Sequence, residues 1–255
     1  MRRSPTPLQP TPLQPDTLRP GALSGDRAAV AEALGTGLLV AVVVGSGIAA
    51  QRLSPDDLGL QLLQNSLATG AGLAALIAVF EPVSGAHFNP VVTLIDWFGG
   101  AIRSATATAY IAAQILGAGL GCMIANLMFD LDAVAVSHTE RSSSGVWLGE
   151  VVATFGLMMV ILGLGRTGRA RFAPFAVGGY ITAAYWFTSS TSFANPAVTL
   201  GRTLTDTFTG IAPSSAAPFI AFQLIGGTLA FALSRYLHPS THPSTERPTT
   251  PGAAQ

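Results

Sequence analysis

Two matching Asn-Pro segments contain the residues of this sequence best suited to act on a solute. Asn89-Pro90-Val91 and Asn195-Pro196-Ala197 are each followed by Val-Thr-Leu. Proline suits the first turn of a helix because that turn needs no N–H from it, and asparagine directly before it is a favourable N-cap. Each segment therefore predicts a helix start, where the asparagine amide and free backbone N–H groups could donate hydrogen bonds to a neutral solute.

The elements that position these segments are apolar. Of the 255 residues, 49% are hydrophobic and 10% are charged, whereas a soluble domain carries about 25% charged residues. A membrane span needs roughly 20 apolar residues. Six runs that contain at most one charge predict spans at 33–51, 58–80, 104–129, 142–165, 172–201 and 207–234. The apolar stretch 82–95 is too short to cross and predicts a re-entrant half-helix, and the end of the fifth run, from about Asn195, predicts a second one.

The two halves of the chain repeat three motifs in the same order. Glu32…Thr36 returns as Glu150…Thr154, the Asn-Pro segment returns 106 residues on, and Gln114 returns as Gln223. Each half holds three spans, so the second copy must be inverted in the membrane, which brings both half-helices to the bilayer centre. Each helix start contributes about half a positive charge, and two such ends facing one pore repel cations, protons included. An ordinary capped loop is the alternative reading, and it suits a single Asn-Pro better than a repeated pair.

Composition also excludes several classes of function. The 13 basic residues, all arginines, balance 13 acidic ones, so no basic patch for nucleic acid is expected. The single cysteine, Cys122, rules out an internal disulfide and a multi-cysteine metal site. We find no nucleophile–base pair, phosphate loop or metal-ligand cluster, and we expect neither an enzyme nor a cofactor.

The charge distribution predicts the domain organisation and the topology. Residues 1–27 and 239–255 are rich in proline and are expected to be disordered tails. They flank a membrane domain expected at 28–238, with repeats at about 28–130 and 142–238. Ten of the 13 arginines fall on the side of the two termini, so the positive-inside rule places both termini in the cytoplasm of a cell whose inner (plasma) membrane holds the protein.

With the segment Ser84-Gly85-Ala86-His87-Phe88 before Asn89, residues 28–238 resemble the major intrinsic proteins, the aquaporin and aquaglyceroporin channels. The resemblance implies an all-α membrane protein with six transmembrane helices plus two re-entrant half-helices in two inverted three-helix repeats. It also implies a pore for small uncharged solutes in each protomer of a homotetramer, and the small-residue stripe Gly117…Gly121 supports such packing. By resemblance, the residues that support the re-entrant loops are Glu32, Thr36, His87, Gln114, Glu150, Thr154 and Gln223.

The sequence departs from the family at the selectivity filter. Val198 stands where the family typically has an arginine that narrows the outer constriction and repels cations. Counting from the Asn-Pro segments without gaps places the filter at Thr69, Ala183, Ser192 and Val198. These residues are small or medium and uncharged, so a wide and weakly polar filter is expected. With this filter the chain resembles a bacterial subgroup of the family that is often encoded with arsenic-resistance genes. The resemblance implies trivalent arsenic hydroxide, methylated arsenicals or glycerol as solutes besides water.

Two other functions remain open from the sequence. Inverted repeats also build proton- or ion-coupled carriers, which here would use Glu81, Glu32 or Glu150, and a non-conducting structural protein is the third possibility. Glu81 is otherwise expected to be a charge of the cytoplasmic vestibule, and Asp96 is expected to pair with Arg103 at the surface.

Overall fold

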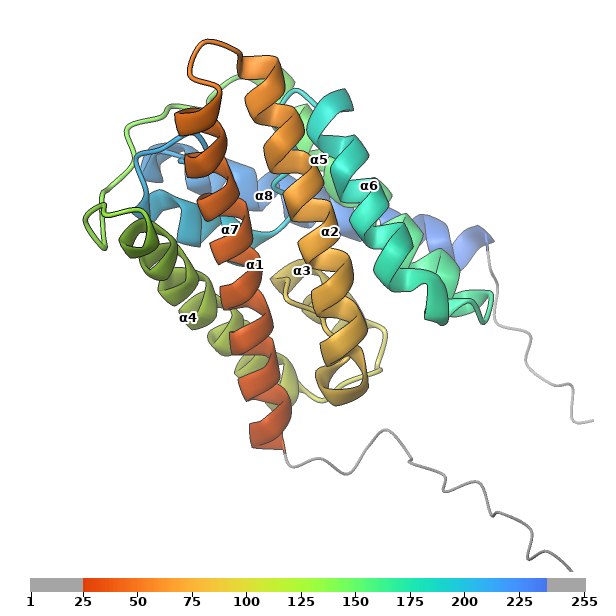
Figure 1. Ribbon diagram of the computed structural model, residues 1–255. Helices are drawn as coiled ribbons and strands as arrows, with labels where there is room; N and C mark the ends of the chain where they lie inside the picture. The colour runs from red at the N-terminus through yellow and green to blue at the C-terminus, as the bar shows by residue number, and fades with distance from the viewer. Residues whose placement is uncertain (1–24, 238–255) are drawn as a thin grey trace, which may run out of the picture.

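The computed structural model describes residues 25–237, which are helical with connecting loops (Figure 1). Its long helices are α1 (Gly25–Leu53), α2 (Leu58–Ser84), α4 (Ser104–Met128), α5 (Ser144–Arg166), α6 (Ala173–Phe187) and α8 (Pro213–Leu237). Two short helices, α3 (Pro90–Phe98) and α7 (Pro196–Gly201), begin at the two Asn-Pro segments. Single 3₁₀ turns precede α6 at Ala170–Phe172 and follow α7 at Arg202–Leu204.

The predicted spans and half-helices correspond to these helices. Five of them, all the long helices except α6, are long and apolar enough to cross a membrane. The fifth uncharged run divides into α6, with 15 residues, and the half-helix α7. The chain leaves α6 at Phe187 because the following loop must return to the start of α7.

The first helix begins three residues before the predicted start of the membrane domain at residue 28. We expected a disordered tail to residue 27, but α1 begins at Gly25. Asp26 lies in its first turn, where a carboxylate interacts favourably with the positive end of the helix dipole. The rest of the two predicted tails, 1–24 and 238–255, lies outside the described residues.

The two halves have the same packing scheme. In the first half α1 packs against α2 and α4, and in the second α5 packs against α6 and α8 in the same way. Each half-helix contacts the last helix of both halves: α3 and α7 each pack against α4 and α8. Because α2 of one half also packs along α6 of the other, the halves close around the two short helices (Figure 1).

The small-residue stripe on α4 packs inside the protomer. A Cβ added at Gly117 would lie 2.1 Å from the carbonyl oxygen of Ala33, and one at Gly121 would lie 2.0 Å from that of Gly37. These two glycines therefore let α4 approach α1 closely, as small residues do between membrane helices. The stripe serves contacts within one chain, so it does not support the expected homotetramer.

Candidate functional site

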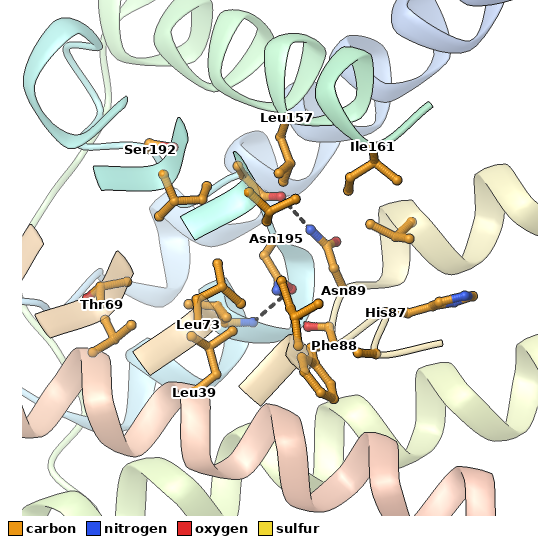
Figure 2. A pocket seen from close by; sticks show the side chains of 18 of the residues that line it. Leu39, Thr69, Leu73, His87, Phe88, Asn89, Leu157, Ile161, Ser192 and Asn195 are labelled. Atoms are coloured by element: carbon orange, nitrogen blue, oxygen red, sulfur yellow. Dashed lines mark hydrogen bonds between the residues drawn. The ribbon is translucent and has the colours of Figure 1, made fainter. Parts of the chain in front are cut away.

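The two Asn-Pro segments meet and bind each other's loops. Nδ2 of Asn89 donates to the carbonyl oxygen of Ala194, and Nδ2 of Asn195 donates to that of Phe88, both at 2.7 Å (Figure 2). Oδ1 of Asn89 accepts the N–H of Val91 and so caps its half-helix. Each Nδ2 carries two N–H donors, so one remains for a solute after the loop carbonyl has been satisfied.

The second asparagine caps its helix in the same way. Oδ1 of Asn195 accepts the N–H groups of Ala197 and Val198. Both asparagines are almost fully buried, and Pro90 and Pro196 occupy the first helical positions. The local sequence therefore fixes both helix starts, as predicted, and the contact between them orients the two amides.

The loops before the asparagines have an unusual backbone that repeats at 106 residues. Ala86 and Phe88 have φ of 49° and 48°, and their counterparts Ser192 and Ala194 have φ of 54° and 50°. Left-handed conformations of non-glycine residues cost about 1–2 kcal/mol each. These four residues keep them because hydrogen bonds from the surrounding helices fix both loops.

Two buried carboxylates supply those hydrogen bonds. Glu32 accepts the N–H groups of His87 at 2.9 Å and Phe88 at 2.7 Å. Glu150 accepts those of Phe193 and Ala194, both at 2.9 Å. The support of the re-entrant loops that the resemblance implied for both glutamates is thus present in the structure.

Glutamine side chains tie each carboxylate to its half-helix. Nε2 of Gln114 donates to Glu32 and to Thr93 of α3, and Nε2 of Gln223 donates to Glu150 and to Thr199 of α7. Thr93 and Thr199 were not predicted for this role, although their match within the repeat is a usable signal. Thr36 and Thr154 differ from expectation: their hydroxyls are buried and have no hydrogen-bond partner among residues 25–237. They sit beside the network without hydrogen-bonding to the loops.

The same hydrogen bonds orient the loop carbonyls. In a trans peptide the N–H of one residue is opposite the C=O of the residue before it. Because the N–H groups of His87 and Phe88 point at Glu32, the carbonyls of Ala86 and His87 point away from it. The second loop is held likewise on Glu150, so the carbonyls of Ser192 and Phe193 point away from that carboxylate. Residues of both loops line one cavity, beside the two asparagines.

This cavity has a volume of about 120 Å³ and extends past both asparagines. One water needs roughly 10–15 Å³ on this scale, so the cavity has room for several waters or one small polyol. Apart from the loops and asparagines its wall is mostly aliphatic, with contributions from Leu39, Val43, Leu73, Ile77, Leu157 and Ile161 (Figure 2). Such a wall offers a solute few hydrogen bonds except along the two loops.

Three of the four predicted filter residues lie on this wall, and the fourth does not. Thr69, Ser192 and Val198 line the cavity. Ala183 is exposed on the outside of α6. Tyr185, two residues on, faces inward instead, and its hydroxyl donates to Oγ1 of Thr69 at 3.2 Å. The gapless count fails because a shift of two residues turns a helical side chain by about 200°.

An arginine also lines the cavity, contrary to the expectation of an uncharged filter. Arg202 lies four residues after Val198 and is only 3% exposed. Its guanidinium carbon lies 3.4 Å from the centre of the Phe193 ring, and Nε donates to the carbonyl of Thr209. In the sequence Arg202 is one of the three arginines that do not lie on the side of the termini, and it lies outside the position where the family has its arginine.

His87 and Asp96 face each other at the other end of the cavity. Nε2 of His87 lies 3.1 Å from the carboxylate of Asp96, and Nδ1 lies 3.0 Å from Oγ1 of Thr93. The predicted pair of Asp96 with Arg103 is therefore replaced by a contact with His87, which supports a hydrogen-bonding role for this histidine. Glu81 also lines the cavity, at an exposed position.

We expect Glu150→Gln to destabilise the fold and to reduce solute flux. The amide retains one acceptor oxygen and turns an N–H₂ group toward the remaining backbone donors. Hydrogen bonds to a charged group contribute about 1.5–3 kcal/mol, and the N–H groups of Phe193 and of the strained residue Ala194 depend on this carboxylate. Thermal unfolding in detergent and flux in proteoliposomes measure the two effects.

Glu140→Gln is the matched control. This carboxylate is exposed and accepts hydroxyls of Ser214 and Ser215, which lower its pKa, so Glu140→Gln should lower stability less than Glu150→Gln and should leave solute flux unchanged. Wild-type stability and flux in Glu150→Gln would show that this carboxylate does not hold the loop.

Comparison with known proteins relates this site to channels. The family model described as "Major intrinsic protein" matches residues 22–192. The chain is 49% identical over 228 residues to aquaglyceroporin AqpS of Rhizobium meliloti (strain 1021), covering 89% of this chain and 97% of that protein. It is 32% identical over 237 residues to aquaporin AqpM of Methanothermobacter marburgensis, covering 82% and 96%.

A solved structure agrees with the fold. The X-ray structure of the aquaglyceroporin from Plasmodium falciparum superposes with a TM-score of 0.67 at 21% identity, covering 85% of this chain and 98% of that one. At this identity the match supports the architecture, six long helices and two half-helices.

Proposed function

The chain belongs to the major intrinsic protein family of membrane channels, and on that premise we propose that it is a passive pore for small uncharged solutes such as water and glycerol-like polyols. The observation that carries this proposal is the meeting of Asn89 and Asn195 in one cavity. Each amide keeps a free N–H beside the N-terminus of a half-helix. A neutral hydroxyl can accept from these donors, whereas a cation meets the positive ends of two helix dipoles.

The carboxylates favour a channel over a coupled carrier. Glu32 and Glu150 are fully buried behind the loops, and neither lines the cavity. Their oxygens accept several hydrogen bonds each, so a change of protonation would disrupt the loops. In the proposed topology Glu81 lies at the cytoplasmic mouth, away from the asparagines. Its charge can attract or repel solutes there, but it is too far from the asparagine amides to couple proton transfer to solute binding.

The proposed filter has Thr69, Tyr185, Ser192 and Val198 on its wall. The hydroxyls of Thr69 and Tyr185 engage each other, so one side of the filter is polar, while Val198 leaves its own side apolar. This combination suits solutes with both hydroxyl and apolar surface. Glycerol is the first candidate, and trivalent arsenic hydroxide and methylated arsenicals are the further candidates, which resemble it in size and in carrying neutral hydroxyls.

The proposed membrane location, orientation and oligomeric state are based on the sequence and the family. We propose a location in the inner (plasma) membrane with both termini in the cytoplasm, as the arginine distribution predicts. We also propose a homotetramer with one pore per protomer. Cross-linking in membranes that yields only monomers and dimers would contradict the tetramer.

Stopped-flow light scattering of proteoliposomes tests the function. Vesicles with the protein should shrink faster in an impermeant osmolyte and re-swell faster with glycerol or arsenous acid than empty vesicles. The rates should be independent of membrane potential and should not saturate. Saturating, potential-dependent uptake would favour the carrier, and rates equal to those of empty vesicles would favour a non-conducting protein.

A further inference from the structure

Arg202 is a buried cation on the cavity wall without a carboxylate partner. Among residues 25–237 no ion pair joins it to an acidic side chain. The guanidinium is held by the face of Phe193 and by the carbonyl of Thr209. A charge kept unpaired within a membrane protein is costly and marks a functional position.

The position of Arg202 brings its charge back toward the filter. It follows Val198 by four residues, which places both on the same side of the helix. Helical side chains point toward the N-terminus of their helix. The guanidinium accordingly reaches back to Phe193, two residues before Asn195.

The repeat contains the same arrangement with the opposite charge. Asp96 lies seven residues after Asn89, and Arg202 lies seven residues after Asn195. In both halves this side chain reaches back to the residue two before the asparagine: Asp96 contacts His87, and Arg202 covers Phe193. Because the halves are inverted, one mouth of the cavity has an acid at this position and the other has an arginine.

A second arginine lies close to Arg202. Arg141 approaches the same Phe193 ring, with its guanidinium carbon 5.3 Å from the ring centre. Its N–H groups donate to the carbonyls of Gly210 and Phe208. Two guanidinium groups therefore face one aromatic ring at this end of the cavity.

We infer that Arg202 supplies the fixed positive charge of the outer filter, from one helical turn beyond the position where the family has its arginine. It excludes cations before they reach the half-helices. Because this charge lies beside the apolar Val198, it hinders the passage of cations without narrowing the filter for larger neutral solutes. The inference rests on the proposed channel function.

Arg202→Gln tests it through two separate readouts in proteoliposomes. Decay of a pH gradient under a potassium/valinomycin clamp measures proton leak, and light scattering measures glycerol flux. We expect proton leak to rise about tenfold or more. At an effective dielectric near 20, the guanidinium repels a proton a few ångströms away by more than the free energy that corresponds to a tenfold change in rate. Glycerol flux should stay within about twofold of wild type, a range below 0.5 kcal/mol.

A rescue variant makes the test specific to charge at the filter. In Val198→Arg/Arg202→Gln the cation returns at the neighbouring turn, and proton exclusion should return with it. Arg52→Gln is the control, since it removes an arginine that is exposed and outside this cavity, and its leak should equal that of wild type. Wild-type proton exclusion in Arg202→Gln, with intact glycerol flux, would overturn the inference. Absence of glycerol flux in the wild-type protein would instead reject the proposed function.

Arg202→Lys provides the test if the glutamine variant does not fold, as judged by size exclusion. Lysine keeps a charge but loses it at high pH, and burial lowers its pKa below the usual value of about 10.4. Proton leak in Arg202→Lys should therefore rise at a lower pH than proton leak in the wild type, because lysine is a weaker base than arginine. A leak that does not change with pH would contradict the role of this charge.

Discussion

Asn89→Asp and Asn195→Asp are each expected to make the pore leak cations. The aspartate at 195 would turn a carboxylate oxygen toward the carbonyl of Phe88, where the asparagine now donates a hydrogen bond at 2.7 Å. It would also place a negative charge where two helix starts repel cations. We expect cation conductance to rise about tenfold or more, which corresponds to only about 1.4 kcal/mol. Glycerol flux should fall, since one donor to the solute is lost.

Asn65→Asp is the matched control for both variants. Asn65 is equally buried, and its Nδ2 donates to the carbonyl of Val43 and to Ser46, but it does not line the cavity. Its substitution should lower stability without producing a cation leak. Proteoliposome flux assays with a potassium gradient distinguish the outcomes, after size exclusion has shown that each variant is folded. Unchanged solute flux and no new leak in both pore variants would disprove the assignment of the two asparagines.

Val198→Arg is expected to reduce glycerol flux much more than water flux. The new guanidinium would enter the cavity at the filter, one turn before Arg202. Thr69 and Ser192 line the same cavity. No acidic residue lines this end of the cavity within the described chain, so the new cation must bind carbonyls and water. We expect the ratio of glycerol to water permeability to fall about tenfold, or about 1.4 kcal/mol in barrier.

Thr203→Arg is the control for the added charge. Thr203 lies in the 3₁₀ turn after α7 and does not line the cavity, so its replacement should leave the permeability ratio unchanged. Size exclusion and water flux must first show that Val198→Arg is inserted and open. A folded variant with the wild-type glycerol-to-water ratio would show that position 198 is not part of the filter.

The sequence by itself determined the elements of this protein and the local geometry of its centre. Runs without charge located the helices because hydrocarbon excludes charged side chains over a fixed thickness. Each Asn-Pro start is a property of adjacent residues, so α3 and α7 begin where predicted. The repeat of Glu32 and Gln114 as Glu150 and Gln223, read with the family resemblance, also predicted that both loops would be supported alike.

Only the tertiary structure decided which side chains face the cavity. The choice of Tyr185 over Ala183 depends on how α6 is rotated about its axis, and an error of two residues along the chain reverses the face. The glycines of α4 pack against α1 of the same chain, a contact that the stripe alone could not distinguish from one between protomers. Arg202 reaches the filter because its long side chain folds back over a turn to the ring of Phe193. Such contacts depend on how distant segments approach one another, and the spacing of residues along a chain does not specify that approach.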